Sequence, residues 1–294
     1  MARTRSLILL LAALPAAVAL GLLLFWSLGR EQGWTAESRA LPTRLTNLSG
    51  ISWDGSRLWL TVDGSARLYR VHPETGAVER TFVLPAVDTG GSSWDGRRLW
   101  QLAYNDRRIY RIDPRDGRIE LSIPSPGRGR CSGMAYDGRH LWLANWEDKL
   151  IYEIDQERGG RVLRSLQGDF ETSGLAWDGR YLWNGVMVGA EEAHDASAPP
   201  TGFVQQRDVA TGEILRVFPI PGVGPGASDW LPGEGRRSCR FWWYDHFHGK
   251  VVRLDLKEEG EGAVRSSLAG LLLLNAGTAV AAAVAFRPRG AARS

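Results

Sequence analysis

Four polar side chains interrupt a set of apolar predicted strands, and they are the first candidates for chemistry. Each lies one or three residues after a recurring tryptophan, on one face of a strand, where the first copy of the pattern carries Leu60 and Val62. A polar group on such a face is costly unless it is paired. Either hydrogen bonding to a neighbouring element or a polar ligand site would explain Gln101, Asn145, Asn184 and Asp245.

Two carboxylates, Asp245 and Glu147, are the candidate catalytic groups because a positioned acid or base can transfer protons. An enzyme requires a cluster around one carboxylate of shifted pKa, built from Asn145, Asn184, Asp245 and Glu147. A binding module requires instead an apolar or aromatic patch without such a cluster. The positions of these side chains therefore distinguish the two functions.

Three histidines are further candidates for ligand binding. His246 and His248 flank Phe247 and are expected on one side of a strand beside Asp245. Two ligands at this spacing can begin a metal site, but no third histidine or Cys-x-x-Cys pair supports it. We therefore expect no metal and no cofactor, and we interpret the pair as pH-sensitive surface histidines. His194 lies in an insertion over 189–202, whose length is typical of a functional or a disordered loop.

The elements that position these residues come from an internal repeat. Its first copy runs from Gly50 to Trp59, and the equivalent glycines follow at spacings of 41, 42 and 41 residues. A degraded fifth copy begins near Ser228. Repeats of this length predict stacked or radially arranged units.

Each copy contains the pattern of four short strands. The Asp-Gly pair between the first two strands predicts a type I′ hairpin turn, in which both central residues have positive φ. A third strand alternates in polarity, as in 109–113, and a glycine-ended turn leads to a fourth strand such as 77–85. Four strands in about 41 residues predict a β-propeller blade. We expect the recurring tryptophans to pack between blades, and the Asp-Gly pairs to form turns rather than metal sites.

The fold class is therefore all-β: a five-bladed β-propeller of four-stranded blades over residues 30–262. The blades are expected at 49–89, 90–130, 131–171, 172–226 and 227–260. The fifth copy lacks a fourth strand, and the segment 35–42 resembles one. We expect this segment to pair with the fifth blade, which would close the ring without a free sheet edge.

The two cysteines are expected at opposite faces of the ring. Cys131 precedes the first strand of the third blade, and Cys239 aligns with the turn between the first two strands of the fifth blade. An oxidising compartment permits a disulfide, but this geometry argues against one.

Both ends of the chain have the composition of transmembrane helices. Residues 7–28 follow a short stub, 1–6, and at 1.5 Å per residue they span about 33 Å, enough to cross a bilayer core. A second apolar run, 267–286, precedes a basic tail, 287–294. The flanking arginines predict that both termini are cytoplasmic and that the propeller lies on the extracytoplasmic side of the cell membrane. A signal peptide cleaved near Ala19 is the alternative to an uncleaved anchor.

The charge distribution argues against nucleic-acid binding. Six of the 36 basic residues lie outside 30–262, so 30 remain there together with all 33 acidic residues. The propeller thus lacks the basic excess that nucleic-acid binding usually requires.

The Gly-x-x-Trp-Asp-Gly-x-x-Leu-Trp and Ile-Tyr-x-Ile-Asp-Pro repeats resemble the bacterial propeller superfamily around SMP-30 and the glutamine cyclotransferases. The segments 101–104 and 144–146 are similar to those that follow the second strand in the cyclotransferases, and five blades favour the plant-type branch. That resemblance implies cyclisation of an amino-terminal glutamine. Leu60 stands where the family has an acidic residue, and Gly90-Gly91-Ser92 replaces its Gly-Glu-Gly.

These observations predict a membrane-anchored extracytoplasmic module that binds a peptide, a glycan or a partner protein. A glutaminyl-peptide cyclotransferase-like enzyme is the alternative, with Asp245 and Glu147 as the groups that would shuttle protons. A metal-dependent SMP-30-like hydrolase is the third possibility. The residues expected to bind the ligand are Gln101, Asn145, Asn184, His194, His246 and His248.

Overall fold

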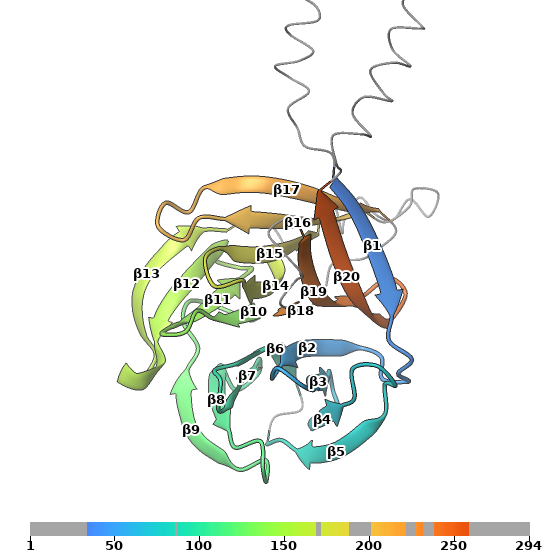
Figure 1. Cartoon of the computed structure of the whole chain (residues 1–294). Coiled ribbons are helices and arrows are strands. Elements are labelled where there is room, and N and C mark those ends of the chain that lie inside the picture. Colours follow the sequence, from blue (N-terminus) through green and yellow to red (C-terminus); the bar gives the residue numbers. More distant parts are fainter. Residues whose placement is uncertain are drawn as a thin grey trace, which may run out of the picture. The chain divides into compact units, whose positions relative to one another are not determined.

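The computed structural model describes residues 34–85, 88–168, 172–187, 201–221, 227–231 and 238–258. Within the compact unit over 36–257, five four-stranded sheets are arranged as the blades of a ring (Figure 1). The repeat-based prediction of an all-β, five-bladed propeller is therefore confirmed.

The first four blades are antiparallel sheets whose strands follow one another from the inside of the ring outward. Blade one consists of β2 (Leu48–Trp53), β3 (Leu58–Val62), β4 (Arg67–Val71) and β5 (Val78–Val83). Blade two consists of β6 (Thr89–Trp94), β7 (Leu99–Ala103), β8 (Arg108–Ile112) and β9 (Ile119–Pro124). Blade three consists of β10 (Cys131–Tyr136), β11 (Leu141–Asn145), β12 (Leu150–Asp155) and β13 (Arg161–Gln167), with a short 3-10 turn, η1 (Gln156–Arg158), before its last strand. Blade four consists of β14 (Thr172–Trp177), β15 (Leu182–Met187), β16 (Thr201–Arg207) and β17 (Ile214–Pro221).

Blade five is built from both ends of the propeller. Its inner strands are β18 (Ser228–Leu231), β19 (Ser238–Asp245) and β20 (Lys250–Glu258), and β1 (Trp34–Ala40) is its outer strand. The backbone of Leu41 donates to Val251 O at 2.7 Å, and Lys257 Nζ lies 2.6 Å from Glu37 Oε2, so β1 runs antiparallel to β20. The closing strand thus lies in the segment where the sequence places it, and the chain enters and leaves the propeller at adjacent points.

One aspartate in each of the first four blades braces both a turn and a buried tryptophan. In blade two, Asp95 Oδ1 accepts the backbone N–H groups of Arg97 and Arg98 at 2.8 and 2.6 Å. Its Oδ2 accepts the indole N–H of Trp100 at 2.8 Å. The same aspartate–tryptophan brace, at 2.7–2.8 Å, joins Asp54 to Trp59, Asp137 to Trp142 and Asp178 to Trp183.

These turns differ from the type I′ geometry that the Asp-Gly pair predicts. Only the glycine has positive φ, for example 95° at Gly55 and 94° at Gly96. The backbone of Asp54 donates to Arg57 O at 3.1 Å, so the aspartate precedes the two central residues instead of being one of them. The type I′ prediction was wrong because the aspartate contributes its side chain to the turn while its backbone stays extended.

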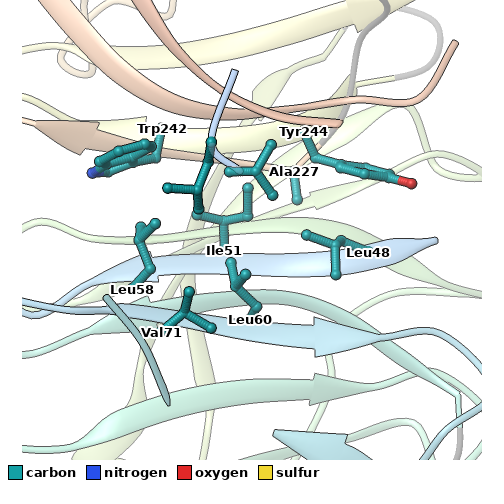
Figure 2. Close-up of a cluster of buried hydrophobic side chains, with 10 residues drawn as sticks. Leu48, Ile51, Leu58, Leu60, Val71, Ala227, Trp242 and Tyr244 are labelled. Carbon is teal, nitrogen blue, oxygen red and sulfur yellow. The ribbon is translucent and has the colours of Figure 1, made fainter. Parts of the chain in front are cut away.

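The recurring tryptophans pack between neighbouring blades, as predicted. Trp59 of blade one stacks on Trp94 of blade two, with ring centroids 6.5 Å apart, and Trp183 stacks on Trp230 of blade five at 5.9 Å. The seam that closes the ring is also apolar: Figure 2 shows Leu48, Ile51, Leu58 and Leu60 of blade one facing Trp242 and Tyr244 of blade five.

The two cysteines do not form a disulfide bond. Cys131 is buried, Cys239 is half-buried, and both thiols are free.

The segments 7–28 and 267–286, and the insertion that contains His194, lie outside the described residues. Within the part of the chain that the structure describes, no helix has the length and apolarity to cross a membrane.

Replacing Asp95 with alanine should lower the free energy of unfolding by about 1–3 kcal/mol, because the buried Trp100 N–H loses its acceptor. Urea denaturation of residues 31–262 would measure this loss. The control is Asp116→Ala, because Asp116 is exposed and supports no buried indole; it accepts the Arg118 backbone N–H in its turn and forms a loose ion pair with the Arg118 side chain. Equal losses in the two variants would contradict a special role for the brace.

Candidate functional site

Two sets of loops lie at one end of the ring, which we call the turn face. They are the connections between blades and the turns between the second and third strands, at 63–66, 104–107, 146–149 and 246–249. Because the strands of each blade are antiparallel, the braced aspartate turns lie at the opposite end.

Asn145 and Asp245 end their strands and stabilise the turns that follow. Asn145 Oδ1 accepts the backbone N–H of Asp148 at 2.9 Å, and its Nδ2 donates to Arg128 O at 2.8 Å. Asp245 Oδ1 accepts the backbone N–H groups of Phe247 and His248 at 3.1 and 3.2 Å. Turn formation therefore accounts for the polarity of both positions.

Gln101 and Asn184 are fully buried and lie in different blades. Gln101 Nε2 donates to Gly90 O at 2.7 Å, and its Oε1 has no hydrogen-bond partner among the described residues. Asn184 accepts from Arg207 Nε at 3.0 Å and donates to Gln205 Oε1 at 3.1 Å. Each of the four predicted polar residues thus bonds within its own blade or to the connection beside it, and the structure does not bring them together.

The two histidines lie in the turn between β19 and β20, so the prediction that they share one side of a strand was wrong. His248 Nδ1 lies 2.5 Å from Asp245 Oδ2. The ring of His246 packs edge-on against Tyr244, with centroids 4.8 Å apart. Partial burial lowers the pKa of His246, although the carboxylates of Asp245 and Asp63 oppose the shift.

Glu147, the second catalytic candidate, is an exposed residue of the turn between β11 and β12. Its carboxylate occupies the space that a side chain at Gly129 would fill, in the connection between blades two and three. No hydrogen bond links it to Asp245 within the described ranges. The two candidate carboxylates therefore do not form one catalytic cluster.

A different set of residues lies at the turn face, near the starts of the innermost strands. They follow the recurring tryptophan by four positions, and we call them the rim: Asp63, Tyr104, Trp146 and His246. The Asp63 backbone donates to Asn47 O at 2.8 Å, just before β2. The ring of Tyr104 lies against Gly90 near the beginning of β6. The Trp146 indole N–H donates to Thr172 O, at the start of β14.

The rim combines flat apolar rings with charged and hydrogen-bonding groups. The Trp146 side chain is 45% exposed, and Asp63 and His246 are also exposed. Burial and the nearby Asp63 carboxylate raise the pKa of the Tyr104 hydroxyl, which therefore stays protonated. Such a surface can stack on a ligand and exchange hydrogen bonds with it. In the sequence, the rim is marked by a position that holds a different residue type in each copy of the repeat. Neighbouring positions of the repeat keep the same residue type.

The innermost strands are joined around the axis by small polar side chains. Ser52 Oγ donates to Ser92 Oγ at 2.7 Å, and Ser93 Oγ accepts the backbone N–H of Tyr136 at 2.9 Å. At the position equivalent to Ser93, blade five carries Asp229, whose Oδ2 accepts the Trp53 N–H of blade one at 2.7 Å. One carboxylate therefore joins the two blades at the closing seam.

The Asp229 carboxyl has a raised pKa, which is typical of catalytic acids and bases. Burial raises its pKa to about 7, while the backbone N–H bonds from Trp53 and Trp230 oppose the shift. A group with this pKa suits general acid–base chemistry. The sequence marks Asp229 as unusual, because the equivalent position of the other four blades holds a small side chain: Ser52, Ser93, Ala135 or Ala176.

Replacing Asp229 with asparagine should stabilise the propeller at high pH. The folded-state pKa of Asp229 lies above the value of 3.8 expected in the unfolded chain. Its contribution to stability is thus fully present below that value and is lost as the pH rises to about 7. Asparagine stays neutral and can still accept the Trp53 N–H.

We expect the unfolding free energy of Asp229→Asn to exceed that of the wild type by roughly 1–3 kcal/mol at pH 8. This value is smaller than the full pKa shift would give, because the Asp229 side chain is partly exposed and solvent screens its charge. The difference should shrink toward pH 4. Urea denaturation across this range measures it, and parallel pH profiles would contradict the assignment.

No known protein family and no curated protein matches the chain. Among solved structures it is similar to the glutaminyl cyclase of Myxococcus xanthus, with a TM-score of 0.60 and 12% identity over 77% of this chain and 97% of that chain. It is more distantly similar to hydrazine synthase of Kuenenia stuttgartiensis, with a TM-score of 0.45 and 17% identity over 75% of this chain and 65% of that one. At these identities the similarity concerns the fold, and it agrees with the resemblance to the glutamine cyclotransferases at the level of a bacterial β-propeller.

Proposed function

We propose that this chain is a membrane-anchored, extracytoplasmic propeller that binds a peptide, a glycan or a partner protein at the rim. The observation that carries this proposal is the exposure of Trp146, the most exposed tryptophan among the described side chains. Its indole nitrogen is held by Thr172 O of the next blade, so the orientation of the ring is fixed before a ligand arrives. A preoriented aromatic surface loses little conformational entropy on binding.

The surroundings of Trp146 support a binding surface. Blade five, which is not adjacent to blade three, also presents an aromatic side chain on the turn face: Phe247 is 44% exposed. The Arg128 side chain is 89% exposed and lies 3.2 Å from Asp148. Aromatic groups bordered by charged groups are typical of sites that recognise other molecules.

The proposed membrane anchoring is supported by the path of the chain. The apolar runs 7–28 and 267–286 precede β1 and follow β20, respectively. These two strands are neighbours, and the Glu37–Lys257 ion pair joins them near the two points where the chain enters and leaves the propeller. Two anchors can therefore connect to one edge of blade five without straining the ring.

Trp146→Ala should weaken ligand binding at least tenfold, because it removes the stacking surface at the rim. The propeller, residues 31–262, would be tested on arrays of peptides and glycans. Val83→Ala is the matched control, because Val83 is 78% exposed but lies on an outer strand, β5. Loss of binding in both variants, or in neither, would contradict binding at the rim.

A glutaminyl-peptide cyclotransferase-like enzyme is the second candidate. It is supported by the similarity in fold to a glutaminyl cyclase and by the Asp229 carboxyl, whose pKa is about 7. Mass spectrometry of the array peptides that begin with glutamine would detect loss of ammonia. Turnover that Asp229→Asn abolishes and Glu147→Gln retains would favour this enzyme over the binding module.

A further inference from the structure

We propose that blade three carries a divalent-metal site, suited to Zn²⁺, at the end of the ring opposite the rim. Its ligands would be Asp137, His140 and Glu153, which each offer one atom to a group whose members all lie within 4.8 Å of one another. Imidazole nitrogen and carboxylate oxygen are ordinary zinc ligands. The site is independent of ligand binding at the turn face.

The three residues come from a braced turn and the strand beside it. Asp137 and His140 lie in the turn between β10 and β11, and Glu153 stands opposite Trp142 in the pairing of β11 with β12. His140 Nδ1 is 2.7 Å from Glu153 Oε1. Zinc ligands lie about 2.0–2.2 Å from the metal, so two ligand atoms of a tetrahedral site are about 3.3–3.5 Å apart. The two atoms therefore need to separate by roughly 0.6–0.8 Å to admit the ion.

Both carboxylates are already oriented by donors that would form the outer shell of the site. The Trp142 indole N–H donates to Asp137 Oδ2 at 2.8 Å, and Arg164 Nε donates to Glu153 Oε2 at 2.5 Å. Outer donors of this kind hold metal ligands in place. The side chains of His140 and Glu153 are 15% and 11% exposed, which leaves access for an ion and a water molecule.

Blades one and two show what these positions look like without a metal site. In blade one the equivalents of His140 and Glu153 are Arg57 and Arg70, and both pair with Glu79 on the outer strand. Blade two repeats the arrangement with Arg98, Arg111 and Glu120.

Blade three differs in having a glutamate on the third strand and an arginine, Arg164, on the outer strand. This exchange brings a second carboxylate beside Asp137, and neighbouring carboxylates repel each other unless a cation lies between them. His140 replaces the arginine with a side chain that can ligate a metal. Where blades one and two have two arginines paired with an outer-strand glutamate, blade three therefore has three side chains that can bind a metal.

The test is a calorimetric titration of the full-length chain, in detergent, with Zn²⁺ alone. We expect one saturable site that His140→Arg abolishes and Glu153→Gln weakens at least tenfold. His140→Arg installs the residue that blades one and two carry, so the melting temperature without zinc should stay unchanged while the increase on adding zinc is lost.

Two further measurements locate the metal. His248→Asn should leave zinc affinity unchanged, because the histidine–carboxylate pair that His248 forms with Asp245 lies at the opposite end of the ring, on the turn face. Anomalous diffraction at the zinc edge should place the ion among the three ligands. Absence of saturable binding, or binding that survives in His140→Arg, would overturn the proposal.

Discussion

The hydrogen bond between a turn aspartate and a buried indole N–H is the interaction on which the rest of the propeller depends. An unpaired buried donor costs about 1–3 kcal/mol, so an acceptor for the indole nitrogen lowers the cost of placing a tryptophan between blades. Asp95 supplies that acceptor for Trp100 and closes the turn with its other oxygen. Blade five departs from this arrangement, because Trp242 Nε1 has no partner among the described residues.

The brace also separates structural from functional positions. At the end of the ring with the aspartate turns, the blades share the same turns, tryptophans and ion pairs. A difference there, such as His140 at the position of Arg98, changes the chemistry of one blade only. At the turn face, the first residue of each turn differs from blade to blade, as Asp63, Tyr104 and Trp146 illustrate. A ring of similar units can thus present dissimilar side chains on one face.

The fold could be predicted because its determinants are local and periodic: strand patterns, Asp-Gly turns, and a segment at 35–42 that resembles a missing strand. The site could not be predicted in the same way. Asn184 looked like a ligand-binding residue because its partner Arg207 lies 23 positions away on the next strand. The pKa of Asp229 depends on burial where blade five meets blade one, and the pairing of His140 with Glu153 depends on a strand register. Contacts of this kind, between separate strands, cannot be predicted from the spacing of residues in the sequence.

Photo-crosslinking in cells that produce the full-length protein tests most directly whether the rim is the binding surface. A photoreactive residue would replace Glu147, next to Trp146, in the full-length protein, with Val83 on β5 as the control position. We expect an adduct from position 147 alone, which added wild-type propeller competes away and the Trp146→Ala propeller does not. Equal labelling from both positions, or equal competition by both propellers, would contradict it.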